Sequence, residues 1–561
     1  MFEICNLKKF LPILQWLPEY SKGNLHGDIS AGLTVGVMLI PQGMAYALLA
    51  GLPPIYGLYA STIPLIIYAI FGTSRQLAVG PVAMVALLVA NGVGELAPLG
   101  SEEYIALAIL LAMMVGLFQL TLGIFRLGFL VNFLSNPVIS GFTSAAALII
   151  GLNQLKHLLG IEIPRNNHIH MILSHAYNAF SETNYITLSI GISAIALIVV
   201  LKKMKSKIPG PLVTVIISIL VVYIFNLDSL GVKIIGKVPG GLPTVGFPTF
   251  NVDAMQGLLP TALTIGLIGF MESIAVAKAI QLKHKNYKID ANQELIGLGL
   301  ANIGGSIFRS FPVNGGYSRT AVNDQSGAKT GMASIISALL IILTLLFLTP
   351  LFYFLPKAIL ASVIMVAVFG LIDWKELIHL WKTDKRDFSM LLITFFTTLT
   401  FGIQQGILTG IILSMGLILF KSAYPHIAIL GKIPGLNIYR NIKRFPQAKE
   451  FDNILIIRFD AQLFFANTHA FQNVIEKEVI KRKGLQKIIL NAEAINSLDS
   501  SAVHILIDTI EELRKNNIKF VFACVKGPVR DIMEKNRMKD KLGDGYFYNS
   551  ISEALEKHNI A

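Results

Sequence analysis

Long apolar segments separated by short polar loops occupy most of the first 420 residues. Segments such as Thr187–Leu201 and Ala333–Leu348 lie in longer, weakly charged runs, whereas a run of about 10–14 apolar residues is typical of a buried helix in a soluble protein. The pattern predicts a polytopic α-helical membrane protein. We count fourteen candidate spans, with centres near residues 40, 62, 86, 113, 145, 191, 218, 268, 299, 322, 341, 364, 394 and 412.

Two of these spans, the third and the tenth, are predicted to be broken. The third contains Gly80-Pro81, and the tenth contains Pro312 and the pair Gly315-Gly316. Proline and paired glycines interrupt a continuous helix. The tenth span is therefore expected to be extended first and helical only from about Ser318, with its non-helical backbone buried in protein or lining a cavity.

The order of the spans predicts an internal repeat. Seven spans, a polar and Gly/Pro-rich connection over Asn226–Met255, and seven more spans form the pattern of an inverted repeat, with halves at about 28–226 and 256–421. In such a repeat the third and tenth spans enter from opposite faces, so their half-helices begin near the midplane and point at each other. Two positive dipole ends then face one cavity.

Outside the transport domain of residues 28–421, the pattern changes. A short lead of residues 1–27 precedes it, and a soluble domain is expected over residues 437–561. Strand and helix patterns alternate in that domain: strand Ile454–Phe459, helix Phe471–Val479, strand Lys487–Leu490, a helix from Ser500 and strand Phe520–Val525. This alternation predicts a small cytoplasmic α/β domain.

Composition and charge support a membrane protein. Of the 561 residues, 53% are apolar and 14% are charged, with a mean hydropathy of +0.63, which is too hydrophobic for a soluble enzyme. The net charge of +13 does not indicate a nucleic-acid partner, because lysines and arginines gather in loops such as Lys202–Lys207 and Lys278–Lys288, as the positive-inside rule expects. That rule places both termini in the cytoplasm.

The sequence contains no pattern typical of an enzyme. The two cysteines, Cys5 and Cys524, lie near opposite ends of the chain and have no metal-ligand spacing around them. There is also no nucleotide-binding loop and no catalytic triad. We therefore expect no enzymatic activity, no cofactor and no bound metal.

Arg319 lies at predicted membrane depth, where an arginine costs at least roughly 2.5–3.5 kcal/mol unless it faces a cavity or a partner. Ser318 and Thr320 flank it, and the N-terminus of a half-helix attracts anions through its free N–H groups and its dipole. We expect an anion site here. The alternative is a structural ion pair with a carboxylate such as Glu272 or Glu294.

Glu272 is the carboxylate placed deepest in an otherwise apolar span. Loss of water disfavours the charged form of a carboxyl group, so Glu272 is expected to bind a proton and to couple transport to protons. A sodium site prefers several converging oxygens, but the residue one turn further on is Val276. Protons are therefore favoured over sodium, and a salt bridge that holds spans together is the structural alternative.

Residues of the first and third spans complete the candidate anion site. Gln42 offers amide donors and Tyr46 offers a hydroxyl, although a buried glutamine in a span also serves to bridge helices. Pro81 is placed at the first helical position of the third span, which leaves the backbone N–H groups of Val82 and Ala83 available to a ligand.

Ser500, at the expected start of a helix in the C-terminal domain, is a candidate regulatory residue. Helix capping by Asp499 or Ser500 is the structural explanation of this sequence. Phosphorylation of Ser500 is the regulatory alternative, because a helix N-terminus tolerates negative charge.

At these residues the chain resembles the sulfate permease family of anion transporters. The most specific parts of the resemblance are Ala31–Tyr46, Gly51–Tyr59, Gly72–Arg75 and Tyr317–Asn323. The C-terminal part looks like the STAS domain that this family carries. Its Leu498-Asp499-Ser500-Ser501 is similar to the phosphorylatable loop of anti-sigma-factor antagonists, with Ala502 where glycine is usual.

The resemblance implies a fourteen-span inverted-repeat transporter, usually a homodimer, whose core domain moves against a gate domain. The family's anion site lies between the third and tenth spans. Its positions correspond here to Gln42, Tyr46, Pro81, Val82, Ala83, Ser318 and Arg319. The family's eighth-span acid corresponds to Glu272, and its proton-coupled members carry glutamate there.

Together these features favour a secondary active transporter of the plasma membrane, most simply a bacterial inner membrane, that takes up an inorganic oxyanion with protons. Sulfate is the first choice, and bicarbonate or a dicarboxylate is the alternative. An anion channel on the same fold, a nucleobase permease and a membrane sensor remain competing hypotheses. The expected partners are the anion, protons and membrane lipid.

Overall fold

The computed structural model describes residues 10–129, 135–162, 169–204, 209–284, 287–538 and 545–556. The chain divides into two compact units, Met1–Ser414 and Met415–Ala561. The expected lead of residues 1–27 and the expected domain of residues 437–561 both extend outside the described residues. Their bounds stay a prediction.

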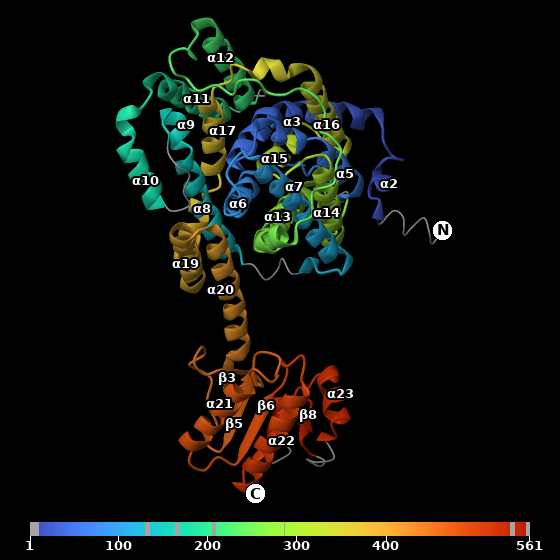
Figure 1. Cartoon of the computed structure of the whole chain (residues 1–561). Coiled ribbons are helices and arrows are strands. Elements are labelled where there is room, and N and C mark those ends of the chain that lie inside the picture. The colour runs from blue at the N-terminus through green and yellow to red at the C-terminus, as the bar shows by residue number, and fades with distance from the viewer. Residues whose placement is uncertain are drawn as a thin grey trace. The chain divides into compact units, whose positions relative to one another are not determined.

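The first unit is built from helices, coloured blue to gold in Figure 1. Its α-helices are α2 (Ile13–Trp16), α3 (Lys22–Leu49), α4 (Pro54–Tyr59), α5 (Ile63–Phe71), α6 (Ala83–Gly94), α7 (Glu102–Ile124), α8 (Asn136–Asn153), α9 (Leu155–Leu159), α10 (Ile169–Asn178), α11 (Tyr185–Lys203), α12 (Gly210–Phe225), α13 (Val252–His284), α14 (Ala291–Ile307), α15 (Tyr317–Gln325), α16 (Met332–Leu343), α17 (Lys357–Phe369), α18 (Trp374–Thr383) and α19 (Lys385–Phe401). Helix α20 (Ile403–Ala423) runs from this unit into the second.

The length and composition of these helices fit a polytopic membrane protein. Within the described residues, nine helices are long and apolar enough to cross a membrane, and Ala83–Gly94 and Gly210–Phe225 are shorter apolar helices. Each expected span centre lies in or beside a helix. The helical membrane class is therefore confirmed, whereas the number of fourteen crossings stays a prediction.

Small residues allow the helices of this unit to approach closely. A Cβ atom added to Gly116 of α7 would lie 2.7 Å from the carbonyl oxygen of Gly299, and one added to Gly299 of α14 would lie 2.8 Å from that of Gly116. Close backbone contact of this kind is the main way in which helices pack within a membrane, where no hydrophobic effect drives them together. Helices α7 and α14 thus form a rigid pair.

Both expected breaks are present. Helix α6 begins at Ala83 after the short strand β1 (Val79–Gly80), and α15 begins at Tyr317 after β2 (Asn314–Gly315). The two strands pair in antiparallel register, with Val79 opposite Gly315 and Gly80 opposite Asn314. Two extended segments more than two hundred residues apart in the chain therefore satisfy each other's backbone groups, as a buried non-helical segment requires.

The second unit holds a six-stranded mixed sheet, coloured orange to red in Figure 1. Its strands are β3 (Ile427–Lys432), β4 (Tyr439–Asn441), β5 (Ile454–Phe459), β6 (Lys487–Asn491), β7 (Lys519–Ala523) and β8 (Phe547–Tyr548), in the order β4-β3-β5-β6-β7-β8. Strands β5 to β8 are parallel, and β3 is antiparallel to both of its neighbours. The expected strands are found, and β3, β4 and β8 are additional.

Helices pack on both faces of this sheet. Helices α21 (Thr468–Lys481), α22 (Ser500–Lys515) and α23 (Gly527–Lys535) cover one face, where Phe459, Phe471 and Leu506 belong to one buried cluster. Helix α25 (Ile551–Glu556) covers the other face through Ile551 and Ala554. The alternating strands and helices thus enclose a core on each side, as an α/β domain must.

Candidate anion-binding site

The paired strands β1 and β2 bring the starts of α6 and α15 together. Gly316 N–H donates to the carbonyl oxygen of Ala78 over 3.1 Å, which extends the pairing beyond the strands. Gly80 has a φ of +153°, a conformation that a residue with a side chain rarely adopts. The first N–H groups of a helix have no partner within the helix. Both helix starts therefore present free donors at one place.

Arg319 is placed at this crossing by the first turn of α15. Its side chain is buried, with 2% exposed, and its Nη1 donates to the carbonyl oxygen of Pro81 over 2.6 Å. Its Nε and Nη2 are buried without a hydrogen-bond partner among the described residues. A Cβ added to Gly316 would lie 2.8 Å from Nη2, and one added to Gly80 would lie 3.5 Å away. The guanidinium thus lies beside both breaks.

Two further predicted site residues lie near this guanidinium, and a third is buried on α3. Tyr46 and Glu272 are both within electrostatic range of Arg319, and of each other. No ion pair within 4.0 Å joins Arg319 to an acidic residue in the part of the chain that the structure describes. Gln42 on α3 is buried, and its Oε1 lacks a hydrogen-bond partner within the same ranges. Unsatisfied buried polar atoms are rare in folded proteins, and each needs an explanation such as a functional role or a bound water or ion.

Pro81, Val82 and Ala83 line the start of α6. Val82 is the N-cap residue in an extended conformation, and Ala83 is the first helical residue. Val82 and Ala83 are 6% and 7% exposed. Pro81 therefore lies one residue before the N-cap, and the expectation that it occupies the first helical position is wrong. Its carbonyl oxygen accepts the hydrogen bond from Arg319.

Ser318 and Thr320 occupy different environments on either side of Arg319. Ser318 is exposed. Thr320 is fully buried, and its Oγ1 accepts from Ala78 N–H over 3.0 Å and donates to the Gly316 carbonyl oxygen over 2.7 Å. Thr320 thus ties the two broken segments together, and its role toward an anion stays a prediction.

Polar residues that the sequence analysis did not single out hold β2 in place. Ser273 on α13 donates to Asn314 Oδ1 over 2.6 Å and accepts from Gly315 N–H over 2.9 Å. Asn302 on α14 accepts from Val313 N–H over 2.8 Å and donates to Val313 carbonyl oxygen over 3.2 Å. The position of Asn314 beside the two glycines was the only signal available, because single serines and asparagines in spans are common.

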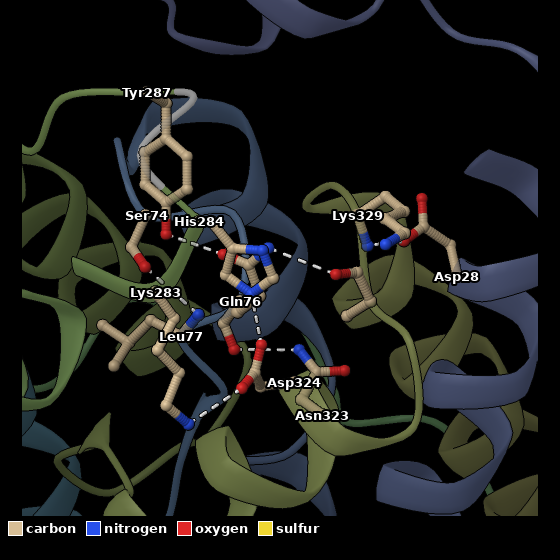
Figure 2. Close-up of polar contacts among 11 residues, drawn as sticks. Asp28, Ser74, Gln76, Leu77, Lys283, His284, Tyr287, Asn323, Asp324 and Lys329 are labelled. Atoms are coloured by element: carbon tan, nitrogen blue, oxygen red, sulfur yellow. Dashed lines mark hydrogen bonds and ion pairs between the residues drawn. The ribbon is translucent and has the colours of Figure 1, made fainter. Parts of the chain in front are cut away.

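A second polar network fastens the other end of α15 (Figure 2). Asn323 Nδ2 donates to the Gln76 carbonyl oxygen over 2.8 Å, and Tyr287 Oη donates to Gln76 Oε1 over 2.6 Å. Asp324 pairs with Lys283 over 3.2 Å and with His284, both at the end of α13. Helix α15 is therefore held at both ends against the segment that leads into β1 and against α13, so Arg319 stands on a rigid support.

In the second unit, Ser500 is the exposed first residue of α22. The N-cap is Asp499, whose Oδ1 accepts from Ala502 N–H over 2.7 Å, while its Oδ2 accepts from Phe465 N–H over 2.9 Å. The capping role therefore falls to Asp499. The regulatory role of Ser500 stays a prediction.

This arrangement defines the class of protein. Helices that begin inside a membrane-spanning bundle and face a common point are typical of secondary transporters. Comparison with known proteins gives the family: residues 25–394 match the sulfate permease family, and residues 445–554 match the STAS domain. The chain belongs to the sulfate permease family. Its relatives are transporters and not enzymes, so the expectation of no enzymatic activity is confirmed.

Plant proteins are similar to this chain over nearly its whole length. Sulfate transporter 4.1, chloroplastic, from Arabidopsis thaliana is 40% identical over 97% of this chain and 82% of that protein. High affinity sulfate transporter 2 from Stylosanthes hamata is 33% identical over 98% of this chain and 87% of that protein. The chain is accordingly a multi-pass membrane protein of an anion transporter family.

Two solved structures have a similar fold. The murine anion transporter Slc26a9 in the inward-facing state aligns with a TM-score of 0.91 at 26% identity, covering 98% of this chain and 94% of that one. The transmembrane domain of the cyanobacterium bicarbonate transporter BicA aligns with a TM-score of 0.61 at 25% identity, covering 71% of this chain and 99% of that one. The predicted membrane fold with a STAS domain is confirmed.

Proposed function

We propose that the protein is a secondary active transporter that takes up sulfate together with protons by alternating access. The observation that supports this most directly is Arg319, a buried guanidinium at the meeting point of two half-helix N-termini, two of whose nitrogens have no hydrogen-bond partner among the described residues. An arginine presents a planar fork of donors that matches the oxygens of an oxyanion. The plant relatives named as sulfate transporters support sulfate as the anion.

Each predicted site residue has a role in this proposal. Arg319 and the free N–H groups of Val82 and Ala83 bind the anion, and Gln42, Tyr46 and Ser318 complete its hydrogen bonds. Thr320 keeps the two helix starts in register. Glu272 carries the proton, because among the described residues its charge would otherwise be opposed by Arg319 alone, which the anion itself neutralises.

The proposal extends to the setting of the protein. We place it in the cell membrane, a bacterial inner membrane in the simplest case, with both termini in the cytoplasm, because basic residues gather in alternate loops. We also propose a homodimer with residues 28–421 as the transport domain and residues 437–561 as the STAS domain. The core that carries α6 and α15 moves as one body, as its two polar networks favour.

The test is uptake of radiolabelled sulfate into proteoliposomes with and without an imposed inward proton gradient. Wild-type protein should accumulate sulfate only with the gradient. Arg319→Gln should lower uptake by about a hundredfold or more, since a buried charge-assisted contact is worth roughly 1.5–3 kcal/mol and several are lost together. Arg530→Gln, the same change at an exposed residue of α23, is the matched control and should leave uptake unchanged.

Competition by unlabelled solutes separates the alternatives. Bicarbonate is tested because of the similarity to the cyanobacterial transporter, and a dicarboxylate and uracil are included. Stronger competition by bicarbonate than by sulfate would change the substrate within the same mechanism. Uptake that equilibrates but never accumulates would indicate a channel. Uptake that survives in Arg319→Gln would contradict the proposed site.

A further inference from the structure

The second unit contains a basic cavity far from Arg319 in the chain. Its volume is about 280 Å³, and its lining is His426, Arg440, Asn441, Arg444, Phe445, Arg458 and Asp460. Three arginines thus face one carboxylate, so the lining is cationic even with a neutral histidine. This cavity has no role in the transport proposal.

Arg458 and Asp460 form the fixed side of the cavity. Asp460 accepts from Arg458 Nε over 2.5 Å and from Arg458 Nη2 over 2.9 Å, and its Oδ2 also contacts His426 Nδ1 at 2.8 Å. Burial alone would raise the pKa of Asp460, but the hydrogen bonds from Arg458 and His426 lower it. The carboxylate is therefore charged at neutral pH, and both of its oxygens contact these two neighbours.

Arg440 and Arg444 form the other side and have no such partner. In the ranges that the structure describes, neither makes an ion pair with an acidic residue. The Arg440 guanidinium lies over the ring of Phe445, with its Cζ 5.7 Å from the ring centroid, which orients it without neutralising it. Two guanidinium groups thus line the cavity without an acidic partner among the described residues.

The size and position of the cavity indicate what it binds. Pockets for drug-sized ligands measure about 300–1,000 Å³, so this cavity suits a smaller group. Arginine forks match the oxygens of a phosphate. His426 follows the end of α20 at Ala423 by three residues, a stretch that spans at most about 10 Å. Helix α20 is among the helices able to cross a membrane, and acidic lipid headgroups gather at such a surface.

We propose that this cavity binds a phosphate group, supplied either by the headgroup of an acidic phospholipid or by a small soluble phosphate compound. Arg440 and Arg444 hold the phosphate oxygens, and Arg458 supports them from the opposite side. Asp460 positions Arg458 and His426 and does not touch the ligand. Binding weakens as the salt concentration rises, because the contacts are partly exposed to solvent.

The experiment uses the purified full-length chain and two probes. Inorganic phosphate is titrated calorimetrically into the protein in neutral detergent. In parallel, nanodiscs of phosphatidylcholine with or without phosphatidic acid are compared by hydrogen exchange of β4 and residues 441–445. Protection by phosphatidic acid alone identifies a headgroup, and binding of free phosphate identifies a soluble ligand. Either result supports the phosphate site, and the absence of both overturns it.

The variant Arg440→Gln/Arg444→Gln should weaken phosphate binding by about tenfold or more, since two charge-assisted contacts are removed. The matched control is Lys443→Gln/Lys449→Gln, which removes two charges from exposed residues outside the lining and should change binding less than twofold. Equal loss in both variants would indicate general charge attraction and overturn the proposal. The proposal would also be overturned if phosphate binding persisted in Arg440→Gln/Arg444→Gln but was lost in Arg319→Gln.

Both arginines are exposed, so the double variant is expected to fold. Melting temperature and elution profile check this directly. If it does not fold, Arg444→Gln alone provides the same comparison against Lys443→Gln, one residue away. Sulfate uptake is measured separately in each variant, so a failure of the phosphate site and a failure of the transport proposal are distinguishable.

Discussion

Two glutamates of the first unit, Glu294 and Glu272, have opposite surroundings. Glu294 is fully buried and accepts four hydrogen bonds: from Tyr68 Oη over 2.7 Å, Thr73 N–H over 2.6 Å, Thr73 Oγ1 over 2.6 Å and Ser74 N–H over 3.0 Å. The Glu272 side chain is partly exposed and makes no hydrogen bond within the described part of the chain. The difference indicates that the first carboxylate maintains structure and the second is available for chemistry.

Local structure explains this difference. Helix α5 ends at Phe71, and the turn after it points the backbone N–H groups of Thr73 and Ser74 toward the first turn of α14, where Glu294 lies. A carboxylate at a helix N-terminus is also favoured by the helix dipole. Glu272 lies in the interior of α13, within electrostatic range of the opposite charge of Arg319.

The largest expected effect comes from Glu294→Gln. The amide group of glutamine would meet donors where the carboxylate accepted, leaving at least one buried donor unsatisfied at about 1–3 kcal/mol each. We expect a loss of about 1–3 kcal/mol in unfolding free energy, seen as a low yield of monodisperse protein and a lower melting temperature. Glu272→Gln is the control and should melt like the wild type. Similar destabilisation by both changes would refute the distinction.

The second largest effect is expected from Glu272→Gln, which should abolish the coupling of sulfate uptake to protons. Glutamine keeps the shape of the side chain but cannot release a proton, so sulfate accumulation driven by a proton gradient should be lost. Exchange of internal for external sulfate should persist, because the anion site is intact. The measurement is uptake and exchange in the same proteoliposome preparation at several external pH values. Gradient-driven accumulation that remains in this variant would assign coupling to another group.

A smaller effect is expected from Gly316→Ala. The added Cβ would lie 2.8 Å from Arg319 Nη2, so the guanidinium must shift while its charge and the fold remain. We expect KM for sulfate to rise about tenfold, equivalent to roughly 1.4 kcal/mol, with little change in melting temperature. Gly94→Ala, at the end of α6 with open space around it, is the matched control. An unchanged KM would mean that the position of the guanidinium does not set affinity.

The sequence was sufficient to predict the helix breaks and the place of Arg319 at a helix start. It was not sufficient to predict which side chains contact Arg319, Glu272 and Glu294. Helix breaks follow from proline and glycine alone, so β1, β2 and the starts of α6 and α15 were predictable within a few residues. Whether Arg319 pairs with Glu272, with Glu294 or with neither depends on contacts between distant spans. In the structure, Glu294 accepts hydrogen bonds from Tyr68, Thr73 and Ser74 and so does not pair with Arg319. No local pattern distinguishes a carboxylate with four donors from one with none.

The absence of a local sequence signal also explains why strands β3 and β4 and the basic cavity of the C-terminal domain were not predicted. Strand β3 follows α20 after only three residues, so its apolar residues continue the hydrophobic pattern of the preceding helix. Strand β4 has three residues and is too short to show alternation. The basic cavity gathers His426, Arg440, Arg444 and Arg458 from three segments. Its charge was visible in the sequence only as scattered basic residues.

The smallest expected effect concerns Asp460, a third carboxylate that is paired with cations outside the membrane. Its pKa lies below the usual 3.8, because hydrogen bonds from Arg458 and His426 outweigh the effect of burial. A carboxyl with a lowered folded-state pKa stabilises the fold above its unfolded-state pKa, and this stabilisation is lost as pH falls through the folded-state value. The side chain is 23% exposed, so solvent screening limits the contribution to less than about 1 kcal/mol.

Asp460→Asn should therefore cost little at pH 7, and the difference from the wild type should shrink further below pH 4. The measurement is hydrogen exchange of β5 in the full chain between pH 7 and pH 3, corrected for the intrinsic exchange rate at each pH. Asp531→Asn, at an exposed residue of α23, controls for the loss of one acidic group. A difference that stays constant with pH would mean that geometry and not charge holds Arg458. Asp460 would then act as Glu294 does, by accepting hydrogen bonds in a fixed geometry, and not as the charged partner of an ion pair.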